Sequence, residues 1–265
     1  MEYLFSHRNK LKDRLKDKFV LLFLDYDGTL TPIVETPDKA VISKERKDLL
    51  DKLSTSSHYR VAIISGRSLN DIKGLVGLKD IIYAGNHGLE IEGPKIKFES
   101  HVSLRLKSVI RNIAEELSKR LSSIKGVLIE DKGLTLSIHY RLVDKKNIPQ
   151  VKTIFHETVI LYLVRNKIKI KTGKMVLEVR PSSEWDKGKV VLWLLARQQF
   201  ALGEKRVFPV YIGDDVTDED AFKVLKRKGL TVFVGEPGSS KADYYVKDPE
   251  EVTQFLRLIL DLKHN

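Results

Sequence analysis

The segment LLFLDYDGTL at residues 21–30 constrains the fold more than any other part of the chain. Val20 to Leu24 form a short unbroken apolar run, which predicts a buried strand rather than an alternating surface strand. Asp25 then falls at the carboxyl end of that strand, where open α/β sheets place their ligand crevice. Asp27 follows on a turn that Gly28 allows to bend sharply. The segment therefore predicts an α/β fold with two carboxylates at a strand tip.

Two carboxylates in this position suit covalent phosphoryl chemistry. Asp25 can attack phosphorus, while Asp27 gives a proton to the leaving oxygen and later takes one from water. The alternative is a solvated Asp-Gly turn with no catalytic role, because short motifs often match by chance.

The composition excludes several classes of protein. A chain of 265 residues is long enough for one or two domains. It has no cysteine, so it can form no disulfide, thiolate nucleophile or zinc–thiolate site, which fits a reducing compartment. The N-terminal segment is charged and shows no secretory signal, and no apolar run is long enough to span a bilayer. We expect a soluble, cytoplasmic protein with no membrane partner.

The formal net charge of +11 raises the hypothesis of nucleic-acid binding. The lysines and arginines are spread over the whole chain, however, with no recognisable nucleic-acid motif. A positive field also steers a dianionic phosphate ester toward a cleft. We therefore expect a small phosphorylated molecule as the partner, and no nucleic acid.

The order of the expected elements changes twice along the chain. Strands and helices alternate up to about residue 100 and again from 182, which predicts a parallel sheet covered by helices. The segment 101–180 has the order α-β-β-α-β-β, a two-layer α+β unit. We therefore expect a catalytic core from 1–100 and 181–265 and an inserted cap domain at 101–180. The expected elements are helices near Lys44–Leu53, Pro149–Leu163, Lys187–Gln199 and Glu250–Leu262, strands Arg60–Ile64, Asp80–Ala84, Val207–Ile212 and Leu230–Val234, and hairpin turns at Asp131-Lys132-Gly133 and Thr172-Gly173.

Further strand tips carry groups that could meet Asp25. One expected strand ends at Ser65, Gly66 and Arg67, where a helix is expected to start. A hydroxyl and backbone N–H groups at a helix start are well suited to bind a phosphate. A simple helix cap is at least as good an explanation of these three residues taken alone.

The segment GDDVTDED follows a second strand and concentrates carboxylates at its tip. Asp214 and Asp215 precede the next helix, and oxygen ligands without sulfur favour a hard cation such as Mg²⁺. Thr217, Asp218 and the acids after it can also serve as ordinary first-turn capping residues.

Lys187 lies at an expected helix start, where its positive charge opposes the helix dipole. A nearby phosphate or carboxylate would offset that cost. A surface role for the lysine is an equally good alternative.

Together, DYDGT, SGR, a lysine before a helix and GDDVTDE resemble the haloacid-dehalogenase-like phosphohydrolases, which implies a Rossmann-like core. The resemblance implies that Asp25 is the nucleophile, Asp27 the general acid and base, and Ser65 a phosphoryl ligand. Lys187 would neutralise the phosphoaspartate. Mg²⁺ would be held by Asp25, the backbone carbonyl of Asp27 and Asp214, with Asp215 and Asp218 supporting the metal from behind.

The inserted segment offers a polar sheet face that could select the substrate. In LTLSIHYR the side chains of Ser137, His139 and Arg141 share one face, opposite the apolar residues. In KMVLEVR the same pattern groups Lys174, Glu178 and Arg180. A glutamate among basic residues suits sugar hydroxyls, whereas the alternative is a merely solvated face.

Motifs along nearly the whole chain are similar to those of trehalose-6-phosphate phosphatases, namely LDYDGTLTPIV, ISGR, AGNHGLEI, HYR, GKMVLEVRP, YIGDDVTDEDAF and SSKADYYVKDPEEVTQFL. The similarity implies substrate contacts from Asn86, His87 and Gly88 on the core and from Arg141, Lys174 and Glu178 on the cap. It also places Arg67 near the phosphate. One departure is Asp186, where the family often has asparagine.

Several functions stay open at this point. The chemistry could act on sucrose 6-phosphate, mannosyl-3-phosphoglycerate or another sugar phosphate, or transfer the phosphoryl group as a mutase does. The chain could also be a non-catalytic sugar-phosphate sensor, or pair with a trehalose-6-phosphate synthase. Retention of both Asp25 and Asp27 favours catalysis, because binding alone does not need a proton shuttle.

Overall fold

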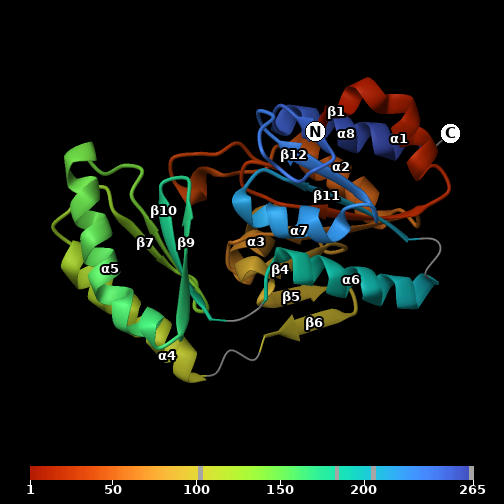
Figure 1. The fold of residues 1–265 in the computed structure, drawn as a ribbon. Coiled ribbons are helices and arrows are strands. Elements are labelled where there is room, and N and C mark those ends of the chain that lie inside the picture. The colour runs from red at the N-terminus through yellow and green to blue at the C-terminus, as the bar shows by residue number, and fades with distance from the viewer. Residues whose placement is uncertain (101–103, 183–184, 204–206, 263–265) are drawn as a thin grey trace. The chain divides into compact units, whose positions relative to one another are not determined.

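The computed structural model describes residues 1–100, 104–182, 185–203 and 207–262 (Figure 1). The chain divides into two compact units. The core unit comprises Met1–Glu99 and Trp185–Asn265, and the inserted unit comprises Ser100–Glu184.

The core unit contains a nine-stranded sheet in the order β1-β13-β12-β11-β2-β3-β4-β5-β6. The pairs from β1 to β4 are all parallel, and β5 and β6 add an antiparallel edge. The predicted parallel-sheet core is therefore confirmed, with the Asp25 strand, β2, at its centre. The strand bounds are β1 Glu2–Tyr3, β2 Phe19–Leu24, β3 Tyr59–Ile64, β4 Ile82–Gly85, β5 Glu90–Gly93, β6 Ile96–Glu99, β11 Val207–Gly213, β12 Leu230–Val234 and β13 Tyr244–Val246.

Helices cover both faces of this sheet, which explains the unbroken apolar run in β2. Leu22 and Leu24 pack in one hydrophobic cluster with α1, α2, α3 and α8, whereas Leu21 and Phe23 pack in a second cluster with α6 and α7. Because successive side chains of a strand point to opposite faces, both sets must be apolar. The helix bounds are α1 Arg8–Leu15, α2 Lys44–Thr55, α3 Leu69–Val76, α6 Lys187–Leu202, α7 Glu219–Leu225 and α8 Pro249–Asp261.

The inserted unit has the predicted order α-β-β-α-β-β. Its antiparallel sheet runs β7-β8-β10-β9, and side chains such as Ile113 of α4 and Phe155 of α5 pack with Leu136 and Leu177 on one face. The element bounds are α4 Leu104–Leu121, β7 Leu128–Asp131, β8 Leu136–His139, α5 Ile148–Val164, β9 Ile168–Gly173 and β10 Val176–Pro181.

The β9–β10 hairpin turns later than the sequence predicts. Gly173 pairs with Val176, so the turn is made by Lys174 and Met175, and Met175 adopts a left-handed φ of 68°. The prediction relied on glycine as the turn residue, but here Gly173 still belongs to the ladder. The prediction that Lys174 shares a strand face with Glu178 is therefore wrong, because Lys174 lies in the turn.

Two further features bear on the expectations from sequence. The edge strands β5 and β6 are four residues each and half polar, and the sequence did not predict them. Among the described residues, none of the helices combines the length and the apolar character needed to traverse a bilayer.

The packing predicts a strong contrast between two phenylalanines on helices of the core unit. Phe255 of α8 is fully buried, whereas Phe200 of α6 is 94% exposed. We expect Phe255→Ala to lower the free energy of unfolding by about 3–5 kcal/mol, because the cavity cannot fully collapse. Phe200→Ala, the matched control, should change it by less than about 0.5 kcal/mol. Denaturant titration followed by circular dichroism measures both, and equal effects would contradict the packing.

Candidate active site

Three loops meet at the carboxyl ends of neighbouring parallel strands. Asp25 follows β2, Ser65 follows β3 and Asp214 follows β11, and β2 lies between the other two strands. The backbone N–H of Asp25 donates to the carbonyl of Ile212 at 2.9 Å, which fixes the Asp25 loop against the end of β11. The sheet therefore brings together the strand tips that the sequence singled out.

Asp25, Asp214 and Asp218 form a buried carboxylate cluster. One oxygen from each of the three side chains lies within 4.8 Å of the others. Asp218 reaches the cluster from a short 3₁₀ helix, Val216–Asp218, that follows the β11 loop. Three carboxylates this close together need positive charge nearby.

Lys187 supplies part of that charge. It is the first residue of α6, its side chain is only 2% exposed, and its Nζ donates to Asp25 Oδ1 at 2.8 Å and to Asp218 Oδ1 at 2.7 Å. Burial alone would lower the pKa of Lys187, but attraction to Asp218 and Asp25 outweighs burial and raises it. Lys187 is therefore a buried ammonium group in contact with two carboxylates.

The neighbouring Asp186 has a structural explanation. Its Oδ1 accepts a hydrogen bond from the backbone N–H of Lys189 at 2.8 Å and caps α6. Aspartate and asparagine are about equally good N-cap residues, so the departure from the family pattern preserves the helix start.

The carboxylate cluster fits a hard divalent cation. Burial raises the pKa of Asp25 well above its usual range, and the charges of Asp218 and Asp214 add to this while Lys187 opposes it. With all four side chains ionised, one ammonium group leaves two negative charges uncompensated. Carboxylate oxygens in a site without sulfur are the ligands that Mg²⁺ prefers.

Both carboxylate oxygens of Asp218 accept further hydrogen bonds, which the sequence analysis did not predict. Tyr211 Oη donates to Asp218 Oδ1 at 2.6 Å, and the backbone N–H of Asp215 donates to Asp218 Oδ2 at 2.9 Å. Burial, followed by the charge of Asp218, raises the pKa of Tyr211 well above its usual range. The only sequence signal for Tyr211 is its position in the strand, two residues before the glycine that ends it.

Asp215 itself serves as a helix cap. Its Oδ1 accepts from the backbone N–H of Val216 at 2.6 Å, and it forms a reciprocal capping box with Asp218. Its carboxylate is not part of the three-carboxylate cluster found among the described residues.

Gly28 allows the turn after Asp27 to pack against Asp214. Its φ is +88°, and a Cβ atom at this position would lie 2.2 Å from Asp214 Oδ2. Thr29 Oγ1 donates to Asp214 Oδ1 at 3.4 Å from the same turn. Only glycine satisfies both the backbone angle and the close approach.

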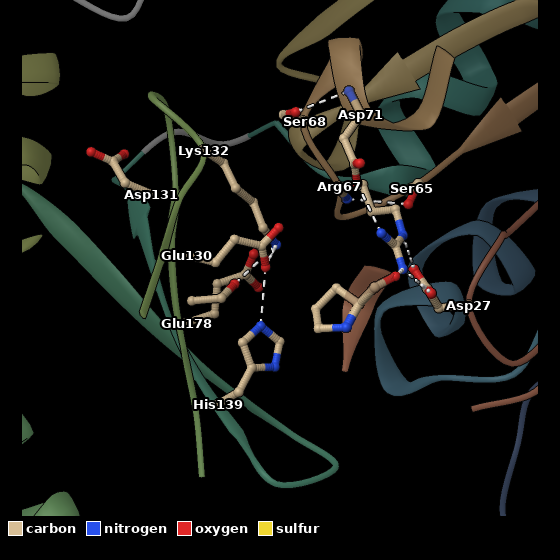
Figure 2. A network of polar contacts seen from close by, with 12 residues as sticks. Asp27, Ser65, Arg67, Ser68, Asp71, Glu130, Asp131, Lys132, His139 and Glu178 are labelled. Carbon is tan, nitrogen blue, oxygen red and sulfur yellow. Dashed lines mark hydrogen bonds and ion pairs between the residues drawn. The ribbon is translucent and has the colours of Figure 1, made fainter. Parts of the chain in front are cut away.

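Asp27 forms a salt bridge with Arg67 (Figure 2) and is not one of the three side chains of the carboxylate cluster found among the described residues. Arg67 Nε donates to Asp27 Oδ2 at 2.8 Å and Nη2 donates to Asp27 Oδ1 at 2.7 Å, a bidentate pair. The Arg67 side chain is 6% exposed and that of Asp27 is 44% exposed. Burial opposes the charge of Arg67, but Asp27 and Asp71 outweigh it and raise its pKa.

The segment Asn86–Gly88 is fastened to the loop at the end of β3. The backbone N–H of Asn86 donates to the Arg67 carbonyl at 2.7 Å, and that of His87 donates to the Ser65 carbonyl at 2.9 Å. Both Asn86 and His87 have left-handed φ angles, of 50° and 57°, which are uncommon for residues other than glycine. The predicted core-rim residues thus lie against the predicted phosphate seat of Ser65 and Gly66.

The polar face of the inserted unit contains more groups than the sequence analysis named. Ser137 stands opposite Glu130 on β7 and opposite Glu178 on β10, so the three side chains share one row of the sheet. Lys132 Nζ donates to Ser137 Oγ at 2.9 Å, and His139 Nε2 lies 3.0 Å from a Glu130 carboxylate oxygen. Figure 2 shows Glu130, Lys132, His139 and Glu178 extending to the same side of the sheet.

The remaining predicted residues of this unit have local partners. Glu178 is 8% exposed and accepts from Arg180 Nε at 2.8 Å. Arg141 Nη2 donates to the backbone carbonyl of Lys174 at 2.9 Å, which ties Arg141 to the β9–β10 turn. These residues belong to the inserted unit, whereas the carboxylate cluster belongs to the core unit.

Comparison with known proteins relates both units to one family. The trehalose-phosphatase family matches residues 23–250. Trehalose-phosphate phosphatase B of Arabidopsis thaliana is 37% identical over 270 residues, covering 96% of this chain and 70% of that protein. Trehalose 6-phosphate phosphatase RA3 of Zea mays is 38% identical over 264 residues, covering 94% of this chain and 72% of that protein.

A solved structure gives the same result for the fold. The C-terminal domain of the Candida albicans trehalose-6-phosphate phosphatase superposes with a TM-score of 0.85 at 25% identity, and the match covers 98% of each chain. The predicted fold class, a haloacid-dehalogenase-like core with an inserted α+β unit, is thereby confirmed. The family match across most of the chain, the sequence identity and the shared fold together show that this chain belongs to the trehalose-phosphatase family.

Proposed function

We propose that the protein hydrolyses trehalose 6-phosphate to trehalose and phosphate through an aspartyl-phosphate on Asp25. The observation that carries the proposal is the buried cluster of Asp25, Asp214, Asp218 and Lys187 at the carboxyl ends of the central strands. Family membership supports the choice of substrate.

In the first half of the reaction, a carboxylate oxygen of Asp25 attacks phosphorus and the bond from phosphorus to the sugar oxygen breaks. Asp27 gives its proton to that oxygen, which leaves as a hydroxyl of trehalose. The Ser65 hydroxyl and the N–H group of Gly66 follow the end of β3 and lie before Ser68, the N-cap of α3, so they would donate to phosphoryl oxygens from the strand tip rather than from the expected helix start. Lys187 neutralises charge on Asp25 during the attack.

In the second half, a water molecule attacks the phosphorus of the aspartyl-phosphate. Asp27 takes a proton from that water, the bond from phosphorus to Asp25 breaks, and hydrogen phosphate leaves. Asp25 is again a carboxylate and Asp27 is again protonated, so one water molecule is consumed in each cycle.

Mg²⁺ is the cation we propose for the carboxylate cluster. Asp25, Asp214 and the backbone carbonyl of Asp27 would hold it, and Asp218 would support these groups from behind through Lys187 and Asp215. When bound, the cation would neutralise charge on the transferring phosphoryl group.

The inserted unit is proposed to select the sugar. We assign substrate binding to Arg141, Lys174 and Glu178, as expected from the sequence. The polar face adds Glu130, which lies in the sheet row, and Lys132, which donates to Ser137 of that row. Carboxylates accept hydrogen bonds from sugar hydroxyls and lysine donates to them, so this mixture suits an uncharged disaccharide. On the core unit, Asn86, His87 and Gly88 are proposed as further contacts. A synthase partner and a cytoplasmic location stay predictions from the sequence.

The substrate assignment predicts a strong preference among phosphate esters. We expect kcat/KM for trehalose 6-phosphate to exceed that for para-nitrophenyl phosphate, sucrose 6-phosphate and mannosyl-3-phosphoglycerate by at least about 100-fold, since buried polar groups reject substrates that leave them unpaired. Glu178→Gln should reduce this preference while leaving para-nitrophenyl phosphate hydrolysis nearly unchanged. Released phosphate is measured for each ester. If trehalose 6-phosphate were hydrolysed no faster than the aryl ester, the substrate assignment would be wrong, although the phosphatase chemistry would stand. If no ester were hydrolysed, the result would favour a non-catalytic sugar-phosphate sensor.

The carboxylate cluster predicts a strict cation requirement. Removing divalent cations with a chelator should abolish phosphatase activity, and Mg²⁺ should restore it. Asp214→Asn should raise the Mg²⁺ concentration for half-maximal activity by at least about 10-fold, because it removes one charged ligand. The control is Asp215→Asn, because the Asp215 side chain caps a short helix. This substitution should change the Mg²⁺ concentration for half-maximal activity much less. Full activity in the presence of the chelator would rule out the proposed metal site.

A further inference from the structure

The contacts of Arg67 differ from those expected of a phosphate-binding arginine. Its guanidinium donates through Nε and Nη2 to Asp27, through Nη1 to Asp71 Oδ2 at 2.8 Å, and through Nη2 again to the Pro37 carbonyl at 2.8 Å. Four of its N–H groups are therefore engaged within the core unit. A guanidinium has five N–H groups, so an incoming phosphate could accept from the fifth alone, and a bidentate phosphate contact would have to displace one of these partners.

From these contacts we infer that Arg67 is a positioning residue for Asp27, and that Asp71 is the positioning residue for Arg67. The inference rests on the proposed function, in which Asp27 transfers the proton. It replaces the phosphate contact expected for Arg67 from the sequence.

Arg67 is anchored independently of Asp27. Its guanidinium carbon lies 5.4 Å from the centre of the buried Tyr26 ring, whose hydroxyl donates to the Ala40 carbonyl at 2.8 Å. Asp71 lies in the first turn of α3, and its backbone N–H donates to Ser68 Oγ at 3.2 Å (Figure 2). Because these partners come from a helix, a loop and a ring packed in the core, Arg67 keeps its place when Asp27 releases it.

The bidentate pair controls the orientation of the Asp27 carboxylate. A planar guanidinium that bonds both oxygens fixes the plane of the carboxylate as well as its position. When Asp27 carries its proton, one oxygen can donate to the leaving sugar oxygen while the other still accepts from Arg67. When Asp27 is ionised, both oxygens return to Arg67. Without this support the half-exposed Asp27 side chain would sample other rotamers, and proton transfer would slow.

A leaving-group series tests the inference. Single-turnover rates of phosphoryl transfer are measured for alkyl and aryl phosphates, from poor leaving groups that need a proton to nitrophenolate, which does not. Asp71→Ala should slow transfer from alkyl phosphates by about 10- to 100-fold, within the range of general acid catalysis. It should slow transfer from para-nitrophenyl phosphate far less. Asp71→Asn, which keeps an acceptor without the charge, should fall between wild type and Asp71→Ala.

Ser68→Ala is the matched structural control. It removes the N-cap of the same helix but leaves the Arg67–Asp71 ion pair in place. It should lower the melting temperature as Asp71→Ala does, without changing the dependence on the leaving group. Arg67→Lys, which keeps the charge but loses the planar fork, should show the same leaving-group dependence as Asp71→Ala.

Two results would overturn the inference. Equal losses for every ester in Asp71→Ala, matched by Ser68→Ala, would give Asp71 a purely structural role. A uniform rise in KM for all esters in Arg67→Lys would make Arg67 a phosphate contact. Because the series does not contain trehalose, either result leaves the substrate assignment untouched. Failure of the wild-type protein to cleave any ester would overturn the proposed function and the inference together.

Discussion

The site depends on the ion pairs that the ammonium group of Lys187 forms with the carboxylates of Asp25 and Asp218. These ion pairs join the start of α6 to the tip of β2 and to the short helix after β11, although Lys187 and Asp25 are 162 residues apart in the sequence. A buried carboxylate cluster without an internal cation would be strongly disfavoured, because desolvation and mutual repulsion both oppose ionisation. One lysine compensates only part of the charge. Under the proposed function, a divalent cation would neutralise the remaining negative charge while Asp25 attacks phosphorus.

The core sheet positions the groups that form these ion pairs. Strand β2 pairs with β3 on one side and with β11 on the other, and apolar clusters cover both of its faces, so neighbouring elements hold its carboxyl end in place. The loops that leave the three strands then need only short turns to bring their side chains together, and Gly28 allows the closest approach to Asp214. The inserted unit is built on a different principle. Its helices cover one face of an antiparallel sheet, and the row of Glu130, Ser137 and Glu178 lies on the other face, where we propose that the sugar binds.

Most of the core could be predicted because its signals are local. The apolar run of β2 and the residues that follow each strand indicate where the strands end, and parallel topology places those ends together. The contacts that could not be predicted join residues far apart in the sequence, or depend on which of several possible partners a side chain binds. No pattern in the sequence near Tyr211 indicates that its hydroxyl donates to Asp218. Arg67 can bind both Asp27 and Asp71 only after α3 has formed, because Asp71 lies on that helix. Because glycine favours turns, the sequence predicts that Lys174 lies in a strand after the turn, whereas the ladder extends through Gly173 and Lys174 lies in the turn itself.

The central claim, that Asp25 accepts the phosphoryl group, is tested most directly by trapping the covalent intermediate. The enzyme would be mixed with substrate and Mg²⁺, quenched in acid within a single turnover, digested and examined by mass spectrometry. The account predicts a phosphoryl group on the peptide that contains Asp25, its loss in Asp25→Asn, and its retention in Asp48→Asn, an exposed aspartate on α2. A phosphoryl group on another peptide, or undiminished turnover in Asp25→Asn, would contradict it.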